Sequence, residues 1–132
     1  MDKATKDEIP ERTEVFARTV IGAAISVHRV LGPGFLESVY ESALCLELET
    51  MGIPFQRQLV VPISYRDRVI GENRLDLVVG ECLVVELKAV DALAPIHSAQ
   101  LLSYLKAAGF RLGLLINFNV PVLKSGIKRM AL

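Results

Sequence analysis

The chain has 132 residues, of which 52% are apolar and 23% charged, and its formal net charge is zero. This length suits one domain with a single sizeable core, and this apolar content excludes a disordered chain. The longest uncharged stretch near the start, residues 19–27, is too short to span a bilayer, so we expect no membrane partner.

The two ends of the chain differ in charge. Residues 1–8, Met-Asp-Lys-Ala-Thr-Lys-Asp-Glu, are polar and of mixed charge, so we expect them not to be a signal peptide. We expect residues 1–11 to form a flexible leader and residues 12–132 a single domain. The last part, residues 101–132, contains no acid and five bases: Lys106, Arg111, Lys124, Lys128 and Arg129. This basic tail is either a contact surface for a polyanion or an ordinary solvated face.

The chain contains two cysteines, Cys45 and Cys82. Neither has the spacing of a zinc site, and two isolated cysteines are typical of reduced thiols in a cytoplasmic protein. We therefore expect a cytoplasmic location.

Two helices are predicted before the first strand. Over residues 14–31, Val15, Ile21, Ala24, Ile25, His28 and Leu31 recur at helical spacing, which predicts an amphipathic helix. Gly32-Pro33-Gly34 ends this helix and begins a second, which Gly52 and Pro54 end. Its apolar stripe is formed by Leu36, Tyr40, Ala43, Leu44 and Leu48. His28 lies near a helix end, where the helix dipole favours a cation, and this interpretation is preferred to a role in a site.

Strands and one further helix follow. Alternating residues predict strands over 55–65 and 69–79, with a turn at Arg66-Asp67, and an apolar run predicts a central strand over 82–88. Pro95 begins a helix that runs to Ala108 and ends at Gly109, and residues 111–117 form another buried strand. The conformation of residues 118–132 is left open. The order predicts an α/β fold, a mixed four-stranded sheet flanked by helices.

Three charged residues, Asp76, Glu86 and Lys88, lie within the apolar run of residues 75–90. Glu86 and Lys88 share a strand face, because they are two residues apart. A two-residue loop at 80–81 would turn Asp76 away from them, whereas a three-residue loop or a bulge would bring it to the same face. We predict the second arrangement, because it gathers the charges at one site.

An Asp followed, on the next strand, by Glu-x-Lys resembles the PD-(D/E)XK nuclease superfamily. The segment from Gly34 to Tyr40, Gly-Phe-Leu-Glu-Ser-Val-Tyr, matches the motif that names the GxxExxY family of that superfamily. Gln100 and Tyr104 resemble the Gln-x-x-x-Tyr element of RecB-like members. The likeness covers roughly residues 14–130. It implies a restriction-endonuclease-like α-β-β-β-α-β core and a nuclease-like site formed by Asp76, Glu86, Lys88, Glu37, Gln100 and Tyr104.

Carboxylates that cluster in this way suit an octahedral Mg²⁺ or Mn²⁺. The expected ligands are Asp76, Glu86, the carbonyl of Leu87 and Glu37, which supplies a carboxylate or orders a water. Lys88 would orient or deprotonate the attacking water, or stabilise charge on the phosphate. The function expected is a metal-dependent nuclease that acts on DNA, with RNA as the less favoured substrate.

Other interpretations remain open at this point. Asp76, Glu86 and Lys88 can also form a structural ion-pair network, and Glu37 can owe its place to the helix dipole. The fold can belong to a non-catalytic module that binds nucleic acid or protein. The small size and the neutral charge leave little surface for DNA, which a homodimer would enlarge. No role is assigned to His97, one turn before Gln100.

Overall fold

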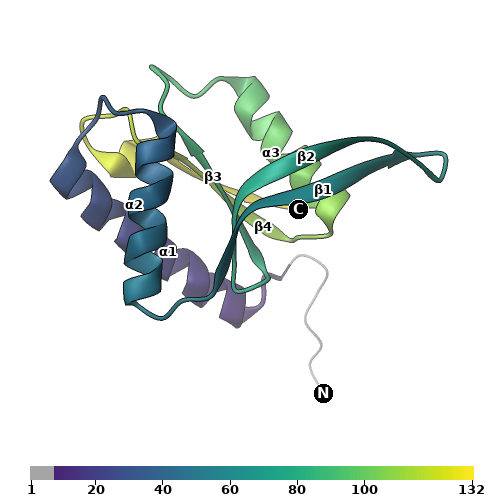
Figure 1. Ribbon diagram of the computed structural model, residues 1–132, viewed down its shortest axis with the longest axis horizontal. Coiled ribbons are helices and arrows are strands. Elements are labelled where there is room, and N and C mark those ends of the chain that lie inside the picture. The colour runs from purple at the N-terminus through teal and green to yellow at the C-terminus, as the bar shows by residue number, and fades with distance from the viewer. Residues whose placement is uncertain (1–7) are drawn as a thin grey trace.

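The computed structural model of the protein describes residues 8–132 (Figure 1). The first seven residues of the predicted leader lie outside this range. In the described part Ile9 packs against the core, and the first helix begins at Glu11, three residues before the predicted start. The helices are α1 (Glu11–Leu31), α2 (Glu37–Thr50), α3 (Pro95–Ala108) and a 3-10 turn η1 (Leu123–Gly126). The strands are β1 (Phe55–Tyr65), β2 (Arg68–Val79), β3 (Leu83–Lys88), β4 (Leu112–Asn117) and β5 (Ile127–Ala131).

The strands form one mixed sheet in the order β1-β2-β3-β4-β5. Successive strands are antiparallel except β3 and β4, which are parallel and are joined by α3. The predicted α/β class and the mixed sheet are confirmed, but the sheet has five strands and not four. The sequence does not predict the fifth strand because the strand is short, lies at the edge of the sheet and carries exposed charges at Lys128 and Arg129. Such charges keep an edge strand from pairing with another chain, but they also hide the alternation of apolar and polar residues that marks a strand.

Helices cover both faces of the sheet (Figure 1). On one face α1 and α2 pack with Leu83, Val85 and Leu87 of β3 in a large apolar cluster. On the other face α3 packs through Leu101 and Leu105. Glu86 and Lys88 alternate with the first set of β3 residues, so they lie on the face that α3 covers.

Two residues of the predicted helical stripes are exposed. Val15 is 46% exposed because the buried face of α1 runs through Ala17, Val20, Ala24 and Val27. Leu36 is 75% exposed because it precedes the first helical residue of α2, so the helical repeat does not apply to it.

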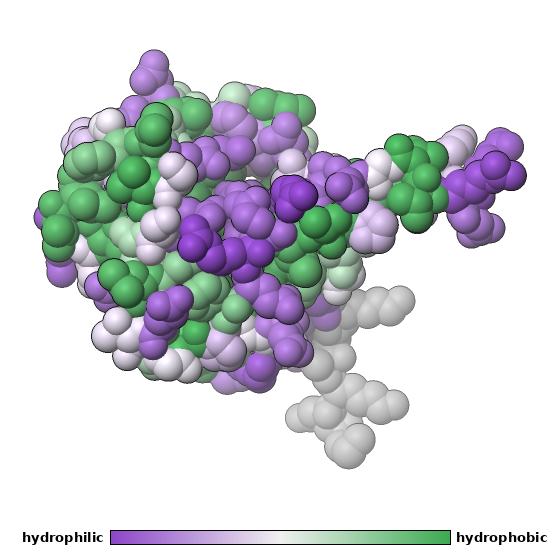
Figure 2. Space-filling model, in the orientation of Figure 1, coloured by the Kyte–Doolittle hydropathy of each residue, from purple (hydrophilic) through white to green (hydrophobic). Residues whose placement is uncertain are grey.

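Strands β1 and β2 continue beyond the helices as a two-stranded ribbon that projects from the body (Figure 1). The turn at its end is made by Arg66 and Asp67, both with positive φ. The ribbon has a hydrophilic tip and an apolar band behind it (Figure 2), and Val69 and Ile70 are exposed. Within residues 8–132, none of the helices has the length and hydropathy needed to cross a bilayer.

Candidate active site

The turn between β2 and β3 places the charged residues. Val79 pairs with Leu83 and Leu77 with Val85, so the loop contains three residues, 80–82. Continuing this register sets Asp76 opposite Glu86 on the same face, and the predicted arrangement is confirmed. Gly80 adopts a left-handed φ of 59°, and a Cβ there would lie 2.3 Å from the ring of Phe16. The turn therefore requires glycine at this position.

The side chains of Asp76 and Glu86 each accept a hydrogen bond from a backbone amide of the neighbouring strand. The Asp76 amide donates to Glu86 Oε1 at 3.2 Å, and the Leu87 amide donates to Asp76 Oδ2 at 2.8 Å. Glu86 is only 5% exposed. Its burial, and then the negative charge of Asp76, raise the pKa of Glu86 to about 9. Without a cation beside it, the Glu86 carboxyl therefore carries a proton at neutral pH.

Glu37 and Lys88 lie near this pair of carboxyls. The surrounding protein partly desolvates the Glu37 carboxyl and raises its pKa, although the residue as a whole is exposed. The charge of Asp76 raises this pKa further, while the charge of Lys88 lowers it. Lys88 is half-buried at the end of β3, and among residues 8–132 no carboxylate lies within salt-bridge distance of its ammonium. The predicted Glu37 thus lies within electrostatic reach of Asp76 and Lys88.

The loop that leads into Glu37 is held by Tyr40. The Tyr40 hydroxyl donates to the Gly32 carbonyl at 2.6 Å and accepts from the Phe35 amide at 3.1 Å. Its ring is fully buried and stacks on Phe118 at 4.5 Å between centroids. Gly34 has a φ of 108° that favours glycine. In the segment Gly34-x-x-Glu37-x-x-Tyr40, the glycine and the tyrosine therefore shape the loop that presents the glutamate.

The residues predicted on α3 occupy different environments. Tyr104 packs against the apolar cluster under α3, and burial, then the charges of Glu86 and Asp76, raise its pKa. Gln100 is half-buried one turn earlier, and its side chain makes no hydrogen bond to another residue within 8–132. His97 accepts a bond from the Ala94 amide through Nδ1 at 2.9 Å, so it caps the helix.

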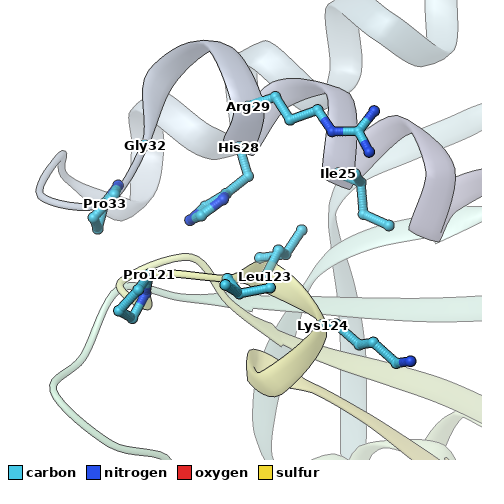
Figure 3. Close-up of a pocket in the computed structure, with 9 residues that line it drawn as sticks. Ile25, His28, Arg29, Gly32, Pro33, Pro121, Leu123 and Lys124 are labelled. Carbon is cyan, nitrogen blue, oxygen red and sulfur yellow. The ribbon is translucent and has the colours of Figure 1, made fainter.

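A separate cavity of about 430 Å³ lies between the end of α1 and residues 121–124 (Figure 3). His28 points toward Pro121 and Leu123 there, and its Nε2 lies 2.8 Å from the Val120 carbonyl. None of the predicted site residues lines this cavity. Through its contact with Val120, His28 joins α1 to the loop after β4.

Three further residues at the site were not predicted. The Gln58 amide donates to Glu41 Oε1 at 2.8 Å and to Asp76 Oδ1 at 3.4 Å. Asn117 is buried beside Lys88, and its side chain bonds both the amide and the carbonyl of Val90, which fixes the chain beyond Lys88. The sequence contains a signal for Glu41, because it lies one helical turn after Glu37 and therefore on the same helix face. Gln58 and Asn117 had none, because their partners are distant along the chain.

The acidic groups of the site are compatible with a divalent cation that takes only a few of its ligands from the protein. In the described part of the chain, no three His, Cys, Asp or Glu side chains lie close enough together to form a metal cluster. Mg²⁺, however, binds commonly through one or two carboxylates and keeps the rest of its shell for water and phosphate. The buried Glu86 carboxyl stays protonated without a partner of opposite charge, and such a cation would supply that partner.

The sequence model of the PD-(D/E)XK nuclease superfamily matches residues 14–130. The chain belongs to this superfamily. No curated protein and no solved structure matches the chain. Membership indicates a nuclease and therefore a nucleic-acid substrate, and PD-(D/E)XK nucleases typically use divalent metals. The match extends from α1 into β5, so the charged pair of β2 and β3 lies inside it.

Proposed function

We propose that this PD-(D/E)XK protein is a Mg²⁺- or Mn²⁺-dependent nuclease of the GxxExxY family that hydrolyses phosphodiester bonds in DNA, with RNA as the alternative substrate. One observation carries the proposal. Asp76 and the buried Glu86 lie side by side on adjacent strands, with Lys88 at the end of the same face. An apolar sheet gains no stability from burying a carboxyl beside a second one, since both burial and repulsion raise its free energy.

Asp76, Glu86 and the Leu87 carbonyl would hold the cation, with Glu37 nearby. When bound, a divalent cation polarises a phosphodiester and lowers the pKa of water. Glu86 would ionise as the cation binds, because the new positive charge offsets the burial and repulsion that keep it protonated.

The remaining residues would act on the water and the phosphate. The Lys88 side chain would orient the attacking water, or deprotonate it as a neutral amine, or stabilise as an ammonium the charge that develops on the phosphate. The Glu37 carboxylate, within electrostatic reach of Asp76 and Lys88, would orient the same water. Tyr104 and Gln100 would bind a phosphate of the substrate from α3. We also infer a cytoplasmic location, because Cys45 and Cys82 are both free thiols.

The test is cleavage of single-stranded, duplex and branched DNA and of RNA by purified protein, with Mg²⁺ and Mn²⁺ titrated and with chelator present. We expect cleavage that chelator abolishes. Glu86→Ala should remove activity by losing a cation ligand. Lys88→Ala should keep calorimetric Mn²⁺ binding while slowing cleavage by a factor of about 10² or more, the range for a lost general base or charge.

The controls are Glu49→Ala and Arg18→Ala, which remove one exposed acid and one exposed base. Both should cleave at the wild-type rate. Activity that survives Glu86→Ala would come from a contaminant. If no substrate is cleaved and no Mn²⁺ is bound, the nuclease proposal is wrong and a non-catalytic module with this fold is favoured.

A further inference from the structure

Gln58 has an unusual backbone for a residue inside a strand. Its φ is 52°, in the left-handed region that non-glycine residues rarely adopt. The β1–β2 ladder pairs Arg57 with Leu77 and Leu59 with Leu75, and it omits Gln58 and Asp76 between them. Strain of this kind persists only where surrounding interactions hold it, and it is often found at functional sites.

The surrounding interactions are those of the side chain. Gln58 Nε2 donates to Glu41 Oε1 at 2.8 Å and to Asp76 Oδ1 at 3.4 Å, which uses both of its N–H groups. Glu41 is fixed in turn, because Arg57 Nη2 and Nε donate to its Oε2 at 3.0 and 3.3 Å. The shorter bond joins Gln58 to Glu41, so Glu41 sets the place of the amide and the amide faces Asp76.

Asp76 is consequently held at both oxygens. Its Oδ2 accepts from the Leu87 amide at 2.8 Å, and its Oδ1 faces Gln58. An amide donor restrains a carboxylate without adding a positive charge, whereas a lysine or arginine there would compete with a cation. Outer groups that orient a ligating carboxylate in this way strengthen metal binding.

We propose that Gln58 is a positioning residue, which holds the Asp76 carboxylate in the orientation that receives the catalytic cation, and that Glu41 and Arg57 fix its amide. This inference rests on the proposed nuclease function. The left-handed backbone turns the Gln58 side chain toward Asp76 and Glu41, which is the reason that the strain is kept.

The test uses Gln58→Met, which keeps the length of the side chain without its donors, and Gln58→Gly, which relieves the left-handed strain. Gln56→Met, at an exposed glutamine of the same strand, is the matched control. Two measurements are made: amide exchange of Leu87 by NMR in metal-free protein, and Mn²⁺ affinity by calorimetry.

We expect faster Leu87 exchange in both Gln58 variants, by about tenfold, because Asp76 is freed to rotate. Mn²⁺ affinity should fall by about 10- to 100-fold in both, the range for lost outer-shell partners. Gln58→Gly should melt no lower than wild type, since glycine adopts this φ freely. Gln56→Met should leave both measurements unchanged.

The outcomes separate this inference from the proposed function. If the wild-type protein neither binds Mn²⁺ nor cleaves, the nuclease proposal fails, while the Leu87 amide still decides whether Gln58 positions Asp76. Unchanged Leu87 exchange in Gln58→Met would overturn the positioning role, whatever the activity. A loss of Mn²⁺ affinity in Gln58→Met that Gln58→Gly does not share would also overturn it, because both variants lack the amide.

Discussion

Among single residues of the site, Glu86 is the one whose pKa the fold changes most clearly. Burial acts on it more strongly than the neighbouring charge of Asp76, and together they raise its pKa from 4.5 to about 9. Its hydrogen bond with the Asp76 amide opposes this shift, as does the charge of Lys88. Above pH 4.5 the unfolded chain therefore loses the Glu86 proton, whereas the folded protein keeps it up to about pH 9.

This shift predicts a pH dependence of stability. Between pH 4.5 and about 9 the folded state binds one proton more than the unfolded state, so stability falls as pH rises. Metal-free wild type should lose up to about 1.4 kcal/mol per pH unit relative to Glu86→Gln, which cannot titrate. Urea unfolding of both proteins at pH 5, 6, 7 and 8 with chelator measures the difference. Parallel curves for the two proteins would show that Glu86 ionises normally.

At the scale of elements, the three-residue turn after β2 decides whether a site exists. Gly80 is confined by its positive φ and by the Phe16 ring, and its amide donates to the Pro54 carbonyl at 2.9 Å. The turn is thus held against α1 and against the start of β1. A change that lengthens or shortens it by one residue moves Asp76 to the opposite face from Glu86.

Gly80→Ala should destabilise the fold by about 1–3 kcal/mol, because the added Cβ meets Phe16 and the backbone is left-handed. Gly22→Ala is the control. Gly22 lies in α1 with nothing within 4 Å of an added Cβ, so this change should stabilise the protein by about 0.5–1 kcal/mol. Urea unfolding measures both. A Gly80→Ala protein as stable as wild type would mean that the turn tolerates other geometries.

At the scale of the whole molecule, the ribbon extends from the place where the charged groups lie. Asp76 directly precedes the β2 residues that pair with β3, Gln58 contacts it from β1, and Arg66 and Arg68 are exposed at the turn between β1 and β2. A nucleic acid bound at Asp76 and Glu86 would continue past the site, and two-stranded ribbons are known to enter grooves of DNA. The ribbon would compensate for the small size and neutral charge of the domain.

Replacing both Arg66 and Arg68 by alanine should weaken duplex DNA binding and reduce the slope of log affinity against log salt by about 2, the number of charges removed. The melting temperature should not change, because both side chains are exposed. Fluorescence anisotropy in Ca²⁺ at several salt concentrations measures the slope. The same change at Arg12 and Arg18 of α1 is the control. An equal slope for wild type and the ribbon variant would assign the ribbon to another partner.

Much of the architecture follows from the sequence alone. Pro95 and Gly109 bound α3 as predicted, Arg66 and Asp67 make the turn of the ribbon, and alternating residues mark β1 and β2. These are local effects of backbone preference and apolar repeat, which neighbours along the chain determine. The same repeat shows that Glu86 and Lys88 share a face, and the sequence motifs by themselves indicate the superfamily.

Other features depend on contacts between distant segments. The sequence allowed a two-residue or a three-residue loop after β2. The folded chain has the three-residue loop, in which Gly80 packs against Phe16 and Asp76 lies on the same face as Glu86. The link from Glu41 through Gln58 to Asp76 joins a helix to two strands. The fifth strand is defined by its pairing with β4. Hydrogen bonds and burial of this kind arise only when the chain is folded, so tertiary structure alone decided them.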